Sequence, residues 1–165
     1  MKNKTSLLFI LGLVTLGMIL NSCKKDTSGS IDKLFTGGNW QLSSATATVY
    51  LGDAITSTAI LNATCTNAQF FTFKDDNTCT YTNFHCLPQT SNGKWSLSPD
   101  KLILSADMTC DTTTSAASYK PFINARIITL GQYSMVLETN DNPVYSATIP
   151  RRVVRYSFVR QKSTI

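Results

Sequence analysis

One stretch of the chain decides its fold class, FFTFKDDNTCTYT at residues 70–82. Apolar and polar side chains alternate on both sides of residues 75–77, and Asp-Asp-Asn is a triplet typical of turns. With the turn centred on the second Asp, two apolar pairs face each other across the hairpin, Phe71 with Tyr81 and Phe73 with Cys79. The stretch therefore predicts a β-hairpin with one apolar, largely aromatic face.

The same period of two continues from Gly38 to the end of the chain. We expect eight strands, at 38–51, 67–74, 78–84, 93–98, 101–107, 121–130, 133–139 and 151–160. All five prolines fall in connections or at the first residue of a strand, where a missing N–H breaks no ladder. Ahead of Gly38, apolar residues at positions 31, 34 and 35 predict a short helical turn.

Long and short connections alternate along this series of strands. The long polar connections are 52–66, 85–92, 108–120 and 140–149, and tight turns join the other strands. Consecutive connections of an up-and-down meander lie at opposite ends. The sequence therefore predicts an all-β fold, an eight-stranded antiparallel up-and-down barrel with a short N-terminal helical turn. Short turns close one end of this barrel, and four long loops surround the other.

Residues 1–22 carry the marks of a secretory signal. A cationic start precedes an apolar run over Leu7–Leu20, which is too short to span a bilayer as a helix. The run ends in Leu20-Asn21-Ser22-Cys23, which resembles the lipobox of bacterial lipoproteins. That resemblance implies cleavage before Cys23 and acylation of this cysteine; the alternative is an ordinary signal peptide with a coincidental cysteine. Lys24, where Asp would favour retention in the inner membrane, implies an outer-membrane address.

Three regions follow from these features: a signal peptide at 1–22, an acylated Cys23 with its tether at 23–36, and the barrel domain at 37–165. The first strand has to run away from the tight-turn end to reach the first long loop. The tether, and with it the membrane anchor, is therefore expected at the closed end of the barrel. The open end then faces the aqueous side, and a ligand is expected at its loops.

Composition and charge exclude several function classes. The 165 residues carry 15 basic and 10 acidic side chains, and removal of the signal peptide leaves 13 basic side chains. This excess is small for a nucleic-acid-binding protein, and the basic residues near the C-terminus (Arg151, Arg152, Arg155, Arg160 and Lys162) are interpreted as a charged strand face. His85 is the only histidine and is predicted to be a solvated loop residue. We expect no catalytic site, no metal and no cofactor.

Two sets of residues carry a family resemblance. Gly38-Asn39-Trp40, which opens the first strand after a helical turn, is similar to the Gly-x-Trp start of lipocalins. The middle of the chain resembles the lipocalin-like domain of small bacterial lipoproteins through Cys65, Phe70–Phe73, Asp76–Thr78, Cys86 and Gly93–Leu97. The resemblance implies a barrel floor closed by the helical turn. It also implies that a basic residue near the end of the last strand, here Arg160, stacks on Trp40.

An eight-stranded barrel has room for its own side chains or for one small ligand. Because the expected inner face is aromatic, we predict binding of a small apolar or amphipathic molecule, with Phe71, Phe73 and Tyr81 as its contacts. The alternative is a ligand-free interaction or structural module in which the barrel is filled by its own side chains. Trp40 and Trp95 are expected to be structural, each closing an end of the barrel from the start of a strand.

Four cysteines remain beside the anchor, and four cysteines allow three pairings. The hairpin register places Cys65 and Cys86 at neighbouring positions, and the family resemblance pairs them too. A bond between Cys79 and Cys110 is not expected, because the first lies near the tight turn and the second at the open end, roughly 20 Å away at about 3.3 Å per residue.

Overall fold

The computed structural model describes residues 28–112, 118–142 and 144–161. Its helical elements are α2 (Ser28–Thr36) and the 3-10 turn η1 (Phe84–Cys86). Its strands are β1 (Asn39–Leu51), β2 (Ala54–Ile60), β3 (Phe70–Phe73), β4 (Thr78–Thr82), β5 (Thr90–Leu97), β6 (Ile103–Ala106), β7 (Cys110–Asp111), β8 (Ser118–Tyr119), β9 (Ala125–Leu130), β10 (Ser134–Asn140) and β11 (Arg151–Arg160). The predicted signal peptide and anchor lie outside the described residues.

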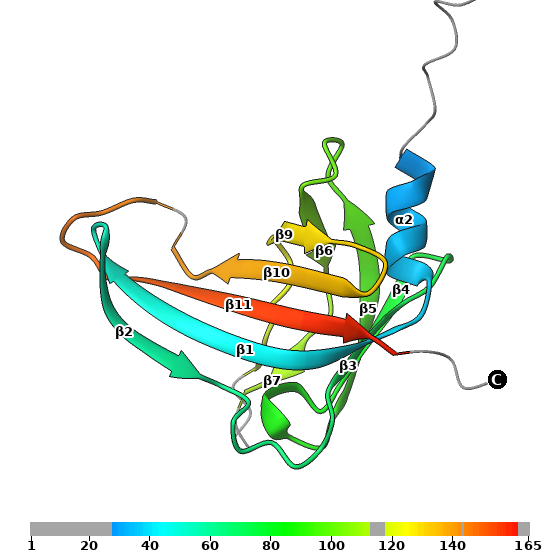
Figure 1. Cartoon of the computed structure of the whole chain (residues 1–165), viewed down its shortest axis with the longest axis horizontal. Helices are drawn as coiled ribbons and strands as arrows, with labels where there is room; N and C mark the ends of the chain where they lie inside the picture. Colours follow the sequence, from blue (N-terminus) through cyan, green and yellow to red (C-terminus); the bar gives the residue numbers. More distant parts are fainter. Residues whose placement is uncertain (1–27, 113–117, 143, 162–165) are drawn as a thin grey trace, which may run out of the picture.

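The strands form a closed antiparallel barrel, seen in Figure 1 with α2 at one end. Around the barrel the order is β1, β3, β4, β5, β6, β9, β10 and β11, and β11 pairs back with β1. The predicted eight-stranded barrel is therefore confirmed. No helix among the described residues is long and apolar enough to span a membrane.

The hairpin that decided the fold class has the predicted register. Phe71 pairs with Tyr81 and Phe73 pairs with Cys79. In the turn, the carboxylate of Asp76 accepts hydrogen bonds from the backbone N–H of Thr78 at 2.9 Å and from its hydroxyl at 2.6 Å. Asn77 adopts a φ of 62°, a left-handed conformation that Asn tolerates better than most residues other than glycine.

Two of the predicted long loops contain additional strands, and a third is shortened by the earlier start of β5. Residues 54–60 form β2, which pairs with the second half of β1, from Thr46 to Leu51. The predicted loop 108–120 contains the short pair β7 and β8, and β5 begins inside the predicted loop 85–92. The prediction missed β2 because all seven of its residues are exposed, so it has no alternation of apolar and polar side chains.

The end of the barrel beside α2 is closed, as predicted. Trp40 is fully buried there, and its indole N–H donates to the Phe35 carbonyl at 3.0 Å. The guanidinium of Arg160 lies 4.5 Å from the centre of the Trp40 ring and donates to the Leu34 carbonyl. The indole N–H of Trp95 donates to the Lys74 carbonyl at 3.0 Å. Both tryptophans therefore fix the closed end, and Arg160 packs on Trp40 as expected.

Gly93 lies where another part of the chain passes close to β5. A Cβ atom at this position would be 2.6 Å from the backbone nitrogen of Met108. The segment that leaves β6 can therefore pack on β5 only because residue 93 has no side chain.

Candidate functional site

The three predicted ligand contacts lie in a packed aromatic core. Phe71 and Tyr81 are 0% exposed and Phe73 is 2% exposed. The Phe71 ring has four aromatic neighbours, with ring centres 4.1 to 6.1 Å away: Phe73, Phe122, Tyr81 and Phe158. In this structure the three side chains contact other rings of the barrel. They form the bottom of the interior, and a ligand that inserted between them would have to displace these neighbours.

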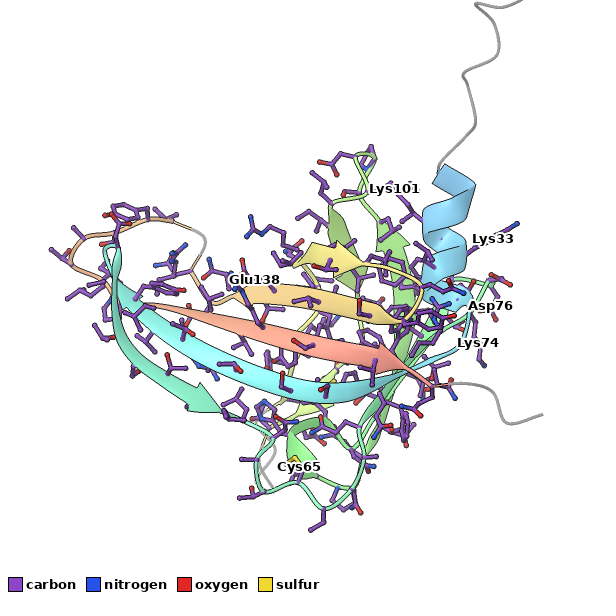
Figure 2. The ribbon with its side chains drawn as sticks, in the orientation of Figure 1. Lys33, Cys65, Lys74, Asp76, Lys101 and Glu138 are labelled. Carbon is purple, nitrogen blue, oxygen red and sulfur yellow. A yellow bond between two sulfur atoms is a disulfide. The ribbon has the colours of Figure 1, made fainter. Side chains whose placement is uncertain are left out.

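The loops at the open end are joined to one another. A disulfide links Cys65, which precedes β3, to Cys86 in η1, so the predicted pairing is confirmed. Figure 2 places Cys65 on the lower side of the molecule, away from α2. The Gln89 amide donates to the Asp111 carbonyl at 2.8 Å and accepts from the Asp111 N–H at 2.9 Å. These links fix η1 against β7 and against the segment that precedes β3.

His85 lies in this cross-linked region between β4 and β5, and the prediction of a solvated loop residue is wrong in part, because the side chain is half-buried. Its ring stacks on Phe84 with the ring centres 4.4 Å apart. The ring bonds to the backbone of Thr112, whereas its Nε2 atom is buried without a hydrogen-bond partner in the described part of the chain. Burial lowers the pKa of His85, and the charge of Arg152 lowers it further. The η1 backbone holds His85 here at a φ of 51°.

Two tyrosines and an arginine lie beside His85. The hydroxyl groups of Tyr119 and Tyr156 share a hydrogen bond, and the ring centres of His85 and Tyr119 are 6.5 Å apart. The positive charge of Arg152 acts on His85, Tyr119 and Tyr156 alike. Burial raises the pKa of both tyrosines. We call these four residues the mouth cluster; they come from η1, β8 and β11.

The prediction that the C-terminal basic residues form one charged strand face is wrong in part, because adjacent side chains of β11 project to opposite faces. Lys162 lies outside the described residues. Arg151 lies on the outside, 5.2 Å from the centre of the Tyr50 ring. Arg155 also lies outside, where Glu138 accepts from its Nε at 2.7 Å (Glu138 is labelled in Figure 2). Arg152 lies on the inner face, two and four positions from the buried residues Val154 and Tyr156.

A wall of small side chains continues from the mouth cluster along the inner face of β11, β1 and β2. Arg152 pairs with Val49, Val154 pairs with Ala47, and on the other side of β1 these partners face Ser57 and Ala59. We call this surface the inner wall; it consists of Ala47, Val49, Ser57, Ala59 and Val154. In Figure 1 these three strands extend well beyond the rest of the barrel. The part of the inner wall on β1 and β11 is largely buried, with Ala47 5% and Val154 4% exposed, whereas its part on β2 is exposed.

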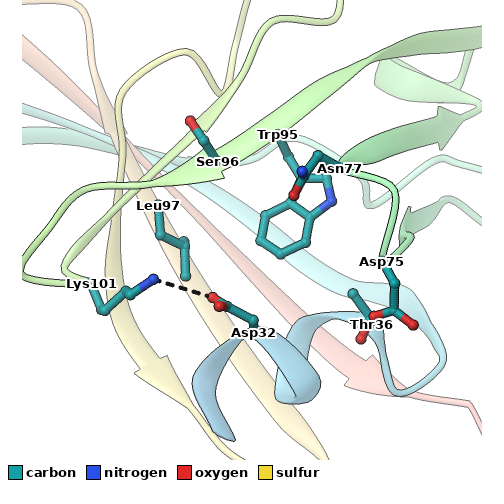
Figure 3. A pocket seen from close by; sticks show the side chains of 8 residues that line it. All are labelled: Asp32, Thr36, Asp75, Asn77, Trp95, Ser96, Leu97 and Lys101. Carbon is teal, nitrogen blue, oxygen red and sulfur yellow. Dashed lines mark hydrogen bonds and ion pairs between the residues drawn. The ribbon is translucent and has the colours of Figure 1, made fainter. Parts of the chain in front are cut away.

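Two small cavities are found among the described residues, and neither is lined by the mouth cluster. Figure 3 shows the first, of about 230 Å³, between α2 and the tight turns, where Lys101 and Asp32 form an ion pair at 3.5 Å. The second, of about 250 Å³, lies beside the disulfide and is lined by polar residues such as Asn62 and Gln69. Both are smaller than the roughly 300 Å³ at which pockets for drug-sized ligands begin.

The remaining cysteines, Cys79 and Cys110, are buried and, as expected, free. The prediction that they lie at opposite ends of the barrel is wrong, since the two thiols are close enough for the charge of Cys110 to act on Cys79. Burial raises the pKa of the Cys79 thiol to about 12 and that of the Cys110 thiol to about 11. Both thiols are therefore protonated at neutral pH and weak nucleophiles. The described residues contain no group of three or more His, Cys, Asp or Glu side chains that could hold a metal ion.

Sequence reasoning missed the mouth cluster because it combines residues from three distant segments. Counting in steps of two from the aromatic Phe158 and Tyr156 would have placed Arg152 on the inner face. No such alternation predicts the positions of His85 and Tyr119, because the packing of the loops determines them.

One of three comparisons with known proteins identifies the family. A crystal structure of a DUF4847 family protein from Bacteroides vulgatus ATCC 8482 is similar at 15% identity and a TM-score of 0.47, over 81% of this chain and 99% of that chain. A search of curated proteins finds no match. Barrels of this type indicate small-molecule binding. The model of the lipocalin-like domain matches residues 36–137, more than half of the sequence, and the chain therefore belongs to the family of lipocalin-like domains.

Proposed function

We propose that this chain is a lipid-anchored protein of the outer membrane that binds a small amphipathic molecule at the open end of its barrel. The observation that carries this proposal is the inner wall, where the small side chains of Ala47 and Ala59 lie opposite each other on β1 and β2, beyond the aromatic rings. Small side chains of this kind leave room for an alkyl chain or a small ring. The mouth cluster supplies polar groups beside it.

In this proposal the aromatic core is the floor of the binding site. Phe71, Phe73 and Tyr81 lie below the ligand, and their packing keeps the floor rigid. The inner wall flanks the ligand, and the cross-linked loops hold the mouth cluster in place. A preformed site of this kind reduces the entropy that binding costs.

The membrane anchor belongs to the proposal as well. Acylation of Cys23 would attach the chain a few residues before α2, and α2 lies at the closed end of the barrel. The open end would then face the aqueous side. Labelling of cells with radioactive palmitate tests this point: the native chain is expected to be labelled and Cys23→Ala to be unlabelled. Equal labelling of both chains would refute the anchor.

Binding is tested with N-phenyl-1-naphthylamine, a neutral apolar dye whose fluorescence rises on binding. We expect saturable binding to the native chain. Ala59→Phe places a ring on the inner wall and should weaken binding at least fivefold. Thr58→Phe is the matched control, because Thr58 is equally exposed but projects to the outer face beside Thr48. Absence of saturable binding, or the same loss in both variants, would contradict the proposal.

The second candidate function is a ligand-free interaction or structural module. The specific observation in its favour is the packing of the core, in which Phe71, Tyr81, Phe122 and Phe158 fill the centre of the barrel with rings. The dye experiment separates the two candidate functions. A filled barrel without a site at its open end is expected to show no saturable binding of the dye.

A further inference from the structure

The cavity at the closed end of the barrel is lined by side chains from three separate elements. It lies between α2 and two tight turns, and its volume is about 230 Å³ (Figure 3). α2 contributes Asp32 and Thr36, the turn between β3 and β4 contributes Asp75 and Asn77, and the turn between β5 and β6 contributes Lys101. We call this cavity the floor pocket.

The walls of the floor pocket are joined to one another. The backbone N–H of Trp95 donates to the Asn77 carbonyl at 2.8 Å, and its indole N–H donates to the Lys74 carbonyl at 3.0 Å. The ion pair between Lys101 and Asp32, at 3.5 Å, connects the other turn to α2. A ligand would therefore meet a preformed site, which reduces the entropy that binding costs.

Several polar groups of the floor pocket are free to bind a ligand. The side chains of Asp75, Asn77 and Thr36 form no hydrogen bond or ion pair within the described residues. Figure 3 shows them around the ring of Trp95, which together with Leu97 supplies the apolar part of the wall. The floor pocket thus combines unused polar groups with a small apolar surface.

The charges of the floor pocket disfavour charged ligands. Asp32 and Lys101 neutralise each other, and Asp75 adds one negative charge. The two carboxylates would repel an anion, and the ammonium group of Lys101 would repel a cation. A neutral ligand avoids both interactions.

The hydrogen-bonding groups of the floor pocket match those of a neutral molecule with several hydroxyl groups. The carboxylates only accept hydrogen bonds, the ammonium group only donates, and the Asn77 amide does both. A hydroxyl group both donates and accepts, so a ring with several hydroxyl groups can use all of these partners. The volume of the cavity equals that of about seven water molecules, which is enough for one sugar ring with an edge left in water.

We propose that the floor pocket binds one neutral sugar ring, with Asp75 and Asn77 as hydrogen-bond partners and Trp95 as the apolar contact of its C–H groups. The site lies at the opposite end of the barrel from the mouth cluster, so the inference does not depend on the proposed function. The sugar ring can belong to a free saccharide or to the headgroup of a glycolipid.

The test is an NMR titration of the full chain, labelled with nitrogen-15, with the methyl α-D-pyranosides of glucose, galactose and mannose. At least one of them should shift the indole N–H signal of Trp95 with saturation, at a Kd of about 1 mM for a ligand of this size. The signal of Trp40, whose indole N–H donates to the Phe35 carbonyl, should not shift.

Two variants assign the binding to the floor pocket. Asp75→Ala should weaken binding about tenfold, the lower range for a hydrogen bond to a charged group. Asp53→Ala is the matched control, because it removes the same charge from an exposed position between β1 and β2, and it should bind like the native chain. Asn77→Gly removes the amide but tolerates the φ of 62°, so it should fold and bind about threefold more weakly.

Three results would overturn the inference: no saturable shift of the Trp95 signal up to about 50 mM glycoside, equal effects of the Asp53 and Asp75 variants, or tighter binding of glucose 6-phosphate than of the glycosides. The source of the sugar is determined with Cys23→Ser, which cannot be acylated. Cosedimentation with phosphatidylcholine vesicles only when they contain monoglucosyl diacylglycerol would indicate a glycolipid. Binding of the glycosides without such cosedimentation would indicate a free saccharide.

Discussion

Loss of the Cys65–Cys86 disulfide should lower the free energy of unfolding by about 3 kcal/mol. The two cysteines are 21 residues apart, and a cross-link of this span removes about 11 cal/mol/K of chain entropy from the unfolded state. At 25 °C this entropy corresponds to the stated loss, or roughly 6 to 12 °C in Tm for a domain of this size. The disulfide also fixes η1, so His85 should be more mobile in a chain that lacks this bond.

The assay is urea unfolding followed by tryptophan fluorescence, because Trp40 and Trp95 are both buried in the closed end. The double variant Cys65→Ser/Cys86→Ser is compared with the native chain, and each is measured with and without a reducing agent. Reduction should bring the native chain to the stability of the variant and leave the variant unchanged. A difference below about 0.5 kcal/mol between the oxidised native chain and the variant would refute the argument from loop closure.

The remaining predictions concern the core, a close backbone approach and the histidine. Phe71→Ala should cost about 3 to 5 kcal/mol in urea unfolding, because it leaves a cavity among four rings; a loss under 1 kcal/mol would mean that the core is not packed there. Gly93→Ala should destabilise the fold by more than 1 kcal/mol, since its Cβ would meet the Met108 nitrogen at 2.6 Å; unchanged stability would contradict this. Folding favours neutral His85, so the unfolded chain binds more protons than the folded chain once the pH falls below about 6.5. The native chain should therefore lose stability below this pH, and His85→Gln should lose less. Parallel plots of stability against pH for the two chains would refute this prediction.

The strand pairing could be predicted because a strand with one buried face has apolar residues at every second position. Phe71, Phe73 and Tyr81 face the core and alternate with polar residues, so one hairpin fixed the register and the inner face. The contact between Trp40 and Arg160 followed from chain direction together with the family resemblance. These features depend on local alternation and on the topology of a closed barrel.

The missed features depend on interactions that leave no periodic pattern. Residues 54–60 form a strand with both faces exposed, so neither face selects apolar residues. Arg151 and Arg152 are identical side chains on opposite faces, and only the register of β11 separates them. The burial of His85 depends on a disulfide and on loop contacts between distant segments. Each of these features required the three-dimensional arrangement of the barrel.

The central claim, that the open end of the barrel binds a small amphipathic molecule, is tested most directly by native mass spectrometry. The chain and its Ala59→Phe variant would be purified in parallel from the native host without exposure to organic solvent. Both would be ionised from a mild detergent that is removed from the protein at low collision energy. We predict that the native chain retains one adduct with the mass of a small amphipathic molecule and that Ala59→Phe retains much less. A folded native chain that retains no adduct and also fails to bind N-phenyl-1-naphthylamine would contradict the account.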